Sequence, residues 1–416
     1  MMSTLLIFIF LASLFIIGFL GNQFFKKTKI SDIVFLILIG FLLGPCLKII
    51  PETGLNLLKE FAPFFGALAL IILLFEGGLH LNFYKVIKEF GRGFSFAFLI
   101  FVLTSLLITI FLFFVFDFPF FYGLLIGVIL AGTCSAVVVP LISKSKANAK
   151  TKILLTLESA ITDVLCVVGA LIILDIIIAK TTTAQVITQT IFGAFAIAAV
   201  IGILGAIIWL HILRDFPGTH EYSYLLTLSV LFLLYALTEF AKGNGAFTAL
   251  VFGIIMGNSK EILRMLRTKE FTIDYTFSKF QAEISLFVKT FFFVYLGLIL
   301  ELTSVTFKVF VIAICIVVLA VLARWVVSKI VIKKEELKYN QKYIMSLHAR
   351  GLAAAVLATY PLALGIINEY TSIILPLTFL VIIITNISAT IWFYKAEKTA
   401  IKNQDNSKIS SNNNCA

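Results

Sequence analysis

Asp163 lies near the middle of a long apolar stretch that runs from Lys152 to Ala179. If a helix starts at the membrane surface near Lys152, a rise of ~1.5 Å per residue places Asp163 roughly 16 Å deep, about half of a ~30 Å hydrocarbon layer. An ionisable side chain at that depth is costly and tends to mark an ion or proton pathway. A single carboxylate there can hold either a proton or a small cation, so the two ions would compete for one site.

Hydroxyl groups flank this carboxylate in the run Thr156-Leu157-Glu158-Ser159-Ala160-Ile161-Thr162-Asp163. A second run at similar depth, Gly132-Thr133-Cys134-Ser135, adds two more hydroxyls. Small hard cations prefer oxygen ligands, and unwound backbone carbonyls can join side-chain oxygens. We therefore predict an ion and proton site formed by Asp163, Thr162, Ser159, Thr133 and Ser135. Within it, Na⁺ or K⁺ would be bound by Asp163, Thr133 and Ser159.

Glu158 is the second acid of the run, and helix geometry separates it from Asp163. Five residues at ~100° each place the two carboxylates about 140° apart around the helix. Charges at this depth almost always pair or face water. We expect Glu158 to form a structural ion pair with Arg324, which lies five residues before Lys329, and Asp163 to remain without a cationic partner.

The elements that position these residues are apolar segments long enough to cross a membrane. Hydrophobic residues make up 61% of the 416-residue chain and charged residues 13%, with a mean hydropathy of +1.08, which excludes an ordinary soluble domain. Thirteen apolar segments recur along the chain, and we predict an all-α integral membrane protein. They lie near residues 4–24, 31–48, 61–80, 94–116, 119–143, 151–179, 186–213, 222–241, 245–258, 281–300, 305–331, 343–366 and 371–394.

The basic residues alternate between the loops. Loops after odd-numbered segments, together with the C-terminal tail, hold 25 Lys and Arg residues, whereas loops after even-numbered segments hold five. The positive-inside rule then predicts an external N-terminus and a cytoplasmic C-terminus in the plasma membrane. This distribution explains the net charge of +11 without a nucleic-acid partner. The polar stretch 401–416 is expected to be a disordered cytoplasmic tail.

The segments divide as six, one and six, with 186–213 as a linking helix. An odd linker inverts the second half relative to the first, which is typical of secondary transporters with inverted repeats. Gly132 and Pro140 in 119–143, and Gly351 and Pro361 in 343–366, occupy corresponding segments. Interrupted helices at matching places indicate a binding site near the membrane midplane.

Other chemistries find little support. No phosphate-cradling glycine motif is present, so we expect transport to be driven by gradients rather than ATP. The five cysteines, at positions 46, 134, 166, 315 and 415, show no metal-binding spacing, and no cofactor is expected. No His-rich, Ser–His or paired-Asp constellation indicates an intramembrane enzyme.

These motifs together resemble the monovalent cation/proton antiporters of the CPA superfamily, closest to the NhaP–NHE-like branch of sodium or potassium/proton exchangers. Supporting matches are Phe75-Glu76-Gly77-Gly78-Leu79, Phe291-Phe292-Phe293-Val294-Tyr295-Leu296-Gly297-Leu298 and Arg324. The resemblance implies a homodimer and a fold like that of NhaA and NapA, with crossed unwound helices. It assigns ion binding to Asp163 and the core ion pair to Glu158 and Arg324. It matches Thr133 to the threonine of the helix crossing and gives Arg350 a supporting role.

The resemblance also implies a division of residues 1–400 into two moving parts. Helices within 1–80 and 222–300 would form an interface domain, and helices within 94–180 and 305–394 a core that moves in an elevator-like manner. Two departures from the branch affect the ions carried. Thr162-Asp163 replaces Asn-Asp, and Thr133-Cys134-Ser135 replaces Thr-Asp-Pro. Because Thr162 cannot titrate, electroneutral one-for-one exchange is favoured. Because Cys134 stands where the branch has Asp, K⁺ is as open a substrate as Na⁺.

Three other functions remain open from sequence. A cation channel or an organic-anion carrier could use a similar inverted repeat, and an anion site would favour Arg350 and helix N-termini. A non-transporting membrane ion sensor would need a sizeable cytoplasmic module, but only about twenty residues follow Lys395.

Overall fold

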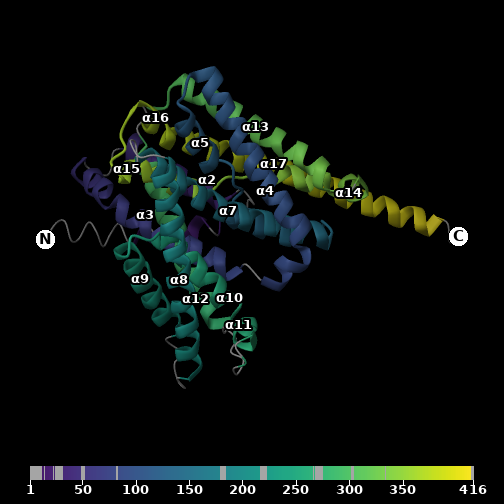
Figure 1. Cartoon of the computed structure of the whole chain (residues 1–416). Coiled ribbons are helices and arrows are strands. Elements are labelled where there is room, and N and C mark those ends of the chain that lie inside the picture. The colour runs from purple at the N-terminus through teal and green to yellow at the C-terminus, as the bar shows by residue number, and fades with distance from the viewer. Residues whose placement is uncertain are drawn as a thin grey trace.

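The computed structural model describes residues 12–13, 15–21, 23, 31–47, 52–80, 83–178, 184–215, 223–265, 267, 275–300, 304–332 and 334–413. Over these residues every regular element is a helix (Figure 1). Most of the first predicted segment, 4–24, lies outside the described residues.

Long apolar helices dominate the element order. The helices are α2 (Asp32–Phe41) with its π-helical continuation η1 (Leu42–Cys46), α3 (Glu52–His80), α4 (Phe83–Phe116), α5 (Phe120–Ile129), α6 (Ser135–Ser143), α7 (Ala149–Ile178), α8 (Ala184–Asp215), α9 (Ser223–Phe240), α10 (Gly245–Gly257), α11 (Ser259–Met265), α12 (Tyr275–Leu298), α13 (Phe307–Val331), α14 (Lys334–Ser346), α15 (Leu352–Ala363), α16 (Glu369–Ser372) and α17 (Ile374–Asn413).

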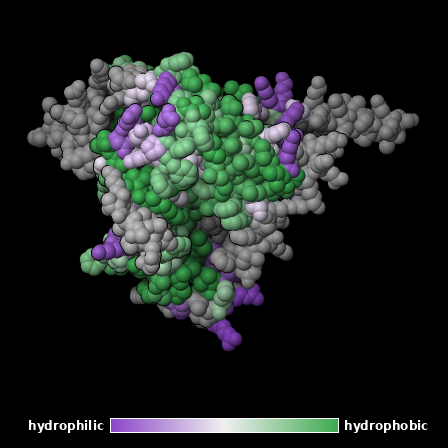
Figure 2. All heavy atoms as spheres, turned by 45° about the horizontal axis from the view of Figure 1, so that its top comes forward, coloured by the Kyte–Doolittle hydropathy of each residue, from purple (hydrophilic) through white to green (hydrophobic). Residues whose placement is uncertain are grey.

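Seven described helices are long and apolar enough to cross a membrane alone, and the bent pair α10–α11 makes an eighth candidate. Four shorter apolar helices lie at Asp32–Cys46, Ala67–Leu79, Phe120–Ile129 and Leu352–Ala363. Together they match twelve of the thirteen predicted segments. Hydrophobic side chains cover most of the coloured surface on the face in Figure 2, with hydrophilic ones gathered toward its margins. Such a surface suits lipid rather than water.

Helix packing repeats between the two halves. α4 packs against α7 in the first half, and α13 packs against α17 in the second. Likewise α2 packs on α12, and α3 on α10. When each of the thirteen predicted segments is matched to the one seven places along the chain, the α4–α7 contact corresponds to the α13–α17 contact. The α2–α12 contact corresponds in the same way to the α3–α10 contact, as an inverted repeat of six plus six requires.

Glycine allows the α2–α12 and α3–α10 backbones to touch. A Cβ atom on Gly297 would overlap the Ile37 carbonyl oxygen, and one on Gly253 would overlap that of Phe75. Small residues at helix contacts are the usual basis of tight packing in membranes. These contacts join helices that the resemblance assigns to the interface domain.

Two helices unwind where the sequence predicts interruption. The chain leaves helical geometry between α5 and α6, and again over 347–351 between α14 and α15. The two irregular segments meet, because the Cys134 N–H donates to the Ala349 carbonyl oxygen at 2.8 Å. Irregular backbone at membrane depth is tolerated when protein buries it, and Thr133, Cys134 and Ala349 are all buried.

The last helix differs from the sequence expectation at its end. α17 continues to Asn413, whereas composition predicts disorder over 401–416. No proline or glycine interrupts the chain from 395 to 413, so nothing in the covalent backbone stops the helix. Figure 1 shows this end of α17 projecting away from the other helices toward the C-terminus.

Candidate ion-binding site

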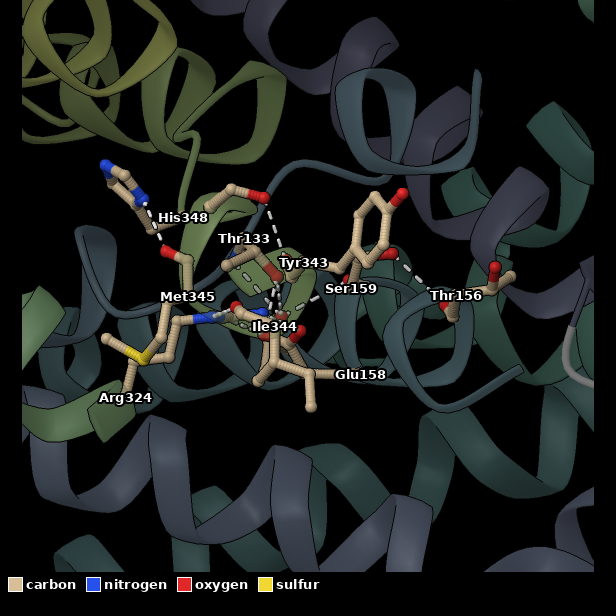
Figure 3. Close-up of polar contacts among 11 residues, drawn as sticks. Thr133, Thr156, Glu158, Ser159, Arg324, Tyr343, Ile344, Met345 and His348 are labelled. Atoms are coloured by element: carbon tan, nitrogen blue, oxygen red, sulfur yellow. Dashed lines mark hydrogen bonds and ion pairs between the residues drawn. The ribbon is translucent and has the colours of Figure 1, made fainter. Parts of the chain in front are cut away.

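A buried ion pair joins α7 to α13 beside the crossing. Arg324 Nη1 lies 2.9 Å from Glu158 Oε1, and Arg324 Nη2 lies 2.7 Å from Glu158 Oε2 (Figure 3). Glu158 is 0% exposed and Arg324 1%. Arg324 Nε also donates to the Ile344 carbonyl in α14. A buried pair needs such two-pronged geometry and added hydrogen bonds to offset the loss of hydration.

Two of the predicted ligand hydroxyls are linked to this pair and make no hydrogen bond to Asp163. Thr133 Oγ1 donates to Glu158 Oε1 at 2.8 Å. The Thr133 backbone N–H donates to Thr162 Oγ1 at 3.2 Å, and the two threonine hydroxyls are 3.3 Å apart. The structure therefore uses Thr133 and Thr162 to attach the first unwound segment to α7.

Asp163 has a different environment, made by the start of α6. Ser135 Oγ donates to Asp163 Oδ2 at 2.7 Å, and the Ser135 backbone N–H donates to the same oxygen at 3.2 Å. Asp163 Oδ1 receives no hydrogen bond from the described part of the chain, and Asp163 is only half-buried. The partners of this carboxylate are thus neutral, and one oxygen is open to a ligand.

Ser159 is buried one turn before Asp163, but its hydroxyl donates to the Thr156 carbonyl at 3.1 Å within α7 (Figure 3). The Ser159 hydroxyl is thus directed back along α7, and it makes no hydrogen bond to Asp163. Of the other four predicted site residues, the structure brings only Ser135 into hydrogen-bond contact with Asp163.

Arg350 lies in the second unwound segment, with its backbone fixed by α17. Its N–H donates to Thr385 Oγ1 at 3.1 Å, and its carbonyl accepts from Asn386 Nδ2 at 2.7 Å. The side chain is buried, and Nη1 has no hydrogen-bond partner among the described residues. The charge of Arg350 acts on both Glu158 and Asp163.

Glu76 is an acid near the site for which the sequence alone predicts no chemical role. Ser285 Oγ donates to Glu76 Oε2 at 2.7 Å, and Gln281 Nε2 donates to Ser285 Oγ at 3.1 Å. The charges of Glu76 and Glu158 both act on Asp163. The one sequence signal for this acid is its place in the run Phe75–Leu79, which supports the family resemblance without giving Glu76 a function.

A family model described as "Sodium/hydrogen exchanger, transmembrane" matches residues 9–394, nearly the whole chain. The chain belongs to this exchanger family. Na⁺/H⁺ antiporter 1 of Methanocaldococcus jannaschii is 29% identical over 303 residues, covering 69% of this chain and 67% of that protein. Probable Na⁺/H⁺ antiporter 2 of the same organism is 31% identical over 180 residues, covering 42% and 41%.

Solved structures show the same fold. The sodium proton antiporter MjNhaP1 of M. jannaschii at pH 8 superposes with a TM-score of 0.78 at 24% identity, over 96% of this chain and 99% of that one. An electron-microscopy structure of MjNhaP1 gives a TM-score of 0.74 at 23% identity, over 95% and 97%.

This exchanger is therefore a multi-pass membrane protein and a secondary active cation/proton antiporter, and it is not an enzyme. The predicted family, the all-helical antiporter fold and the transport function are confirmed. In such a protein, a half-buried carboxylate with neutral partners can bind an ion reversibly, whereas the buried Glu158–Arg324 pair is already neutralised.

Proposed function

We propose that Asp163 binds H⁺ and a monovalent cation alternately, and that the exchanger moves one for the other across the plasma membrane. The observation that carries this proposal is the environment of Asp163. Its partners in the described structure are the neutral donors of Ser135, and Oδ1 is open. A carboxylate fixed to a cationic partner could not release its charge to a transported ion, but this one can.

The proposed cation ligands are Asp163 and Ser135, which are already in contact. The hydroxyl oxygens of Ser159, Thr133 and Thr162 are further proposed ligands. The Thr133 hydroxyl donates to Glu158 and the Thr162 hydroxyl accepts from the Thr133 backbone N–H, so both would have to turn toward Asp163 to contribute. Na⁺, K⁺ and H⁺ are the transported ions, and no cofactor is required by this chemistry.

A one-for-one stoichiometry is supported by the charges around the site. Glu158 is neutralised by Arg324, and Thr162 has no titratable proton. Asp163 is then the acid that changes its charge during the cycle. The core carries the same net charge when loaded with H⁺ or with Na⁺ or K⁺, so a complete cycle moves no net charge.

The motion that we propose is an elevator-like displacement of a core against an interface domain. Helices α4–α7 and α13–α17 would form the core, α2, α3, α9, α10 and α12 the interface domain, and α8 the linker. The close backbone contacts of α2 with α12 and of α3 with α10 support a rigid interface domain. We also propose a homodimer, an external N-terminus and a cytoplasmic C-terminus.

The test is cation-dependent dissipation of a pH gradient in proteoliposomes. Asp163→Asn should abolish exchange with Na⁺ and with K⁺, because the amide can neither release a proton nor supply a negative oxygen. Asp175→Asn is the matched control, because Asp175 lies on the same helix and is exposed; it should retain exchange. Continued exchange by Asp163→Asn would rule out the proposed function.

A further inference from the structure

The start of helix α6 lacks a cap from its own side chains. The first N–H groups of any helix have no partner within it, and Ser, Thr, Asp or Asn at the N-cap position usually satisfies them. The N-cap residue of α6 is Cys134, and its side chain makes no capping hydrogen bond. In contrast, Asn244, Thr306 and Asn368 cap α10, α13 and α16 with their own side chains.

The Cys134 thiol is also held away from that role by packing. A Cβ atom on Gly351 would collide with Cys134 Sγ, which places the sulfur against the second unwound segment. The Cys134 backbone N–H is committed to Ala349. Because a thiol is a weak acceptor, residue 134 contributes no anionic or strongly accepting group to the crossing.

Asp163 takes over the missing cap. Its Oδ2 accepts both the backbone N–H and the hydroxyl of Ser135, the first residue of α6. The positive end of the helix dipole faces the same carboxylate. Two hydrogen bonds and the helix dipole therefore act on one oxygen of Asp163. All three withdraw negative charge from the carboxylate that we propose as the cation ligand.

We propose that the Cys134-Ser135 pair determines cation selectivity and makes the site prefer K⁺ over Na⁺. This inference rests on the proposed function of Asp163. Cys134 supplies no strong acceptor at the crossing, and the hydrogen bonds from Ser135 occupy one of the two carboxylate oxygens of Asp163. The cation is left with one open carboxylate oxygen and neutral hydroxyls, which is a site of weak field.

A weak field favours the larger ion for a simple reason. Na⁺ holds its hydration shell more tightly than K⁺ and needs stronger anionic ligands to replace the lost water, as selectivity arguments based on ligand number and field strength require. The charge of Glu76 acts on Asp163 from outside the site, where Ser285 on α12 donates to this carboxylate, and Glu158 is neutralised by Arg324. The charge of Arg350 also acts on Asp163, with the sign opposite to that of Glu76.

The experiment compares half-saturating concentrations of K⁺ and Na⁺ in the proteoliposome pH-gradient assay. The unaltered exchanger should show a lower half-saturating concentration for K⁺. Cys134→Asp adds a carboxylate to the crossing and strengthens the field, so it should shift the K⁺/Na⁺ ratio toward Na⁺ by at least about tenfold. A preference for Na⁺ in the unaltered chain would overturn the proposal, as would an unchanged ratio in Cys134→Asp.

Ser135→Ala provides a second variant, which tests the donor side of the proposal. It removes the 2.7 Å hydroxyl donor from Asp163 Oδ2, and since donors to a carboxylate favour its ionised form, protons should compete more strongly. The pH at which exchange is half-maximal should rise by about one unit, and Ser135→Thr should restore it. Ser143→Ala, at the other end of α6 with an exposed hydroxyl, should leave the profile unchanged.

The two proposals fail in different ways. If the unaltered chain shows no cation-dependent exchange, or if Asp163→Asn retains it, the proposed function is wrong. If exchange depends on Asp163 but the pH profile of Ser135→Ala matches that of Ser143→Ala, only the selectivity proposal is wrong.

Discussion

Arg324 holds both carboxylate oxygens of Glu158, from two different nitrogens and with both side chains out of contact with solvent. Glu158 stands five residues from Asp163 on α7, yet the two acids have separate partners. Glu158 is neutralised within the fold, and Asp163 is the acid that we propose for transport. The consequences of that separation can be measured.

Breaking the buried pair should destabilise the fold strongly. Glu158→Gln leaves the Arg324 guanidinium buried without its counter-charge, and such a loss costs about 3–5 kcal/mol. We expect a markedly lower midpoint of thermal unfolding in detergent. The double variant Glu158→Gln with Arg324→Met should recover part of the loss, because no buried charge remains.

The matched comparison for that prediction is the ion pair between Lys289 and Asp32. Their side chains are 15% and 13% exposed, so water can replace a lost partner more easily. Asp32→Asn should lower the unfolding midpoint less than Glu158→Gln does. An equal effect of the two substitutions would contradict the role given to burial.

Protons and cations should compete for Asp163. Lowering the pH fills the carboxylate with protons, so below the pH of half-protonation the half-saturating cation concentration should rise about tenfold per pH unit. Raising the cation concentration should move the pH profile of exchange toward acid. The measurement is a matrix of pH and cation concentration in proteoliposomes, and a half-saturating concentration independent of pH would exclude a shared site.

Membrane potential should have little effect on the steady exchange. If Asp163 binds one H⁺ in one direction and one cation in the other, the loaded site has the same net charge in both directions. An imposed potential of about 100 mV is worth ~2.3 kcal/mol per elementary charge. If each cycle moved a net charge, this potential would change the direction and extent of exchange measurably. Exchange driven by potential alone, with no cation or pH gradient, would show that the stoichiometry is not one to one.

The crossing of the unwound segments should be intolerant of a side chain at Gly351. Gly351→Ala would drive a Cβ atom into Cys134 Sγ, which forces the two segments apart. We expect loss of exchange with the protein still inserted in the membrane. Gly193→Ala on α8 is the control, because a Cβ atom added there would meet no other atom within 4 Å. The double variant Gly351→Ala with Cys134→Gly should regain the space and with it part of the exchange.

Much of the architecture follows from local patterns. Apolar length sets the number and bounds of the spanning segments, because a helix must satisfy its own backbone groups in lipid. The interruptions near Gly132 and Gly351 follow from local residue types as well. These inferences do not require any knowledge of which helix touches which.

The assignment of hydroxyls to acids could not be made in this way. Thr133, Ser135, Thr162 and Ser159 are all at a depth suited to the site, and depth alone makes them equivalent. Thr133 and Ser135 are two positions apart, yet one bonds Glu158 and the other Asp163. That choice depends on the angle at which the first unwound segment crosses α7, which is set by packing between residues far apart in the chain.

The sequence by itself determined that an isolated acid lies at the middle of a membrane helix, that another acid five residues earlier faces elsewhere, and that the chain is a multi-spanning transporter. Helical periodicity and the length of lipid-soluble segments are local properties, so they can be read without contacts. Only the tertiary structure decided that Asp163 caps the helix that begins at Ser135, that Arg350 is buried without a partner for Nη1 in the described residues, and that Glu76 lies within electrostatic reach. Those relationships arise where separate helices meet, and the free energy of their packing has no counterpart in any single segment.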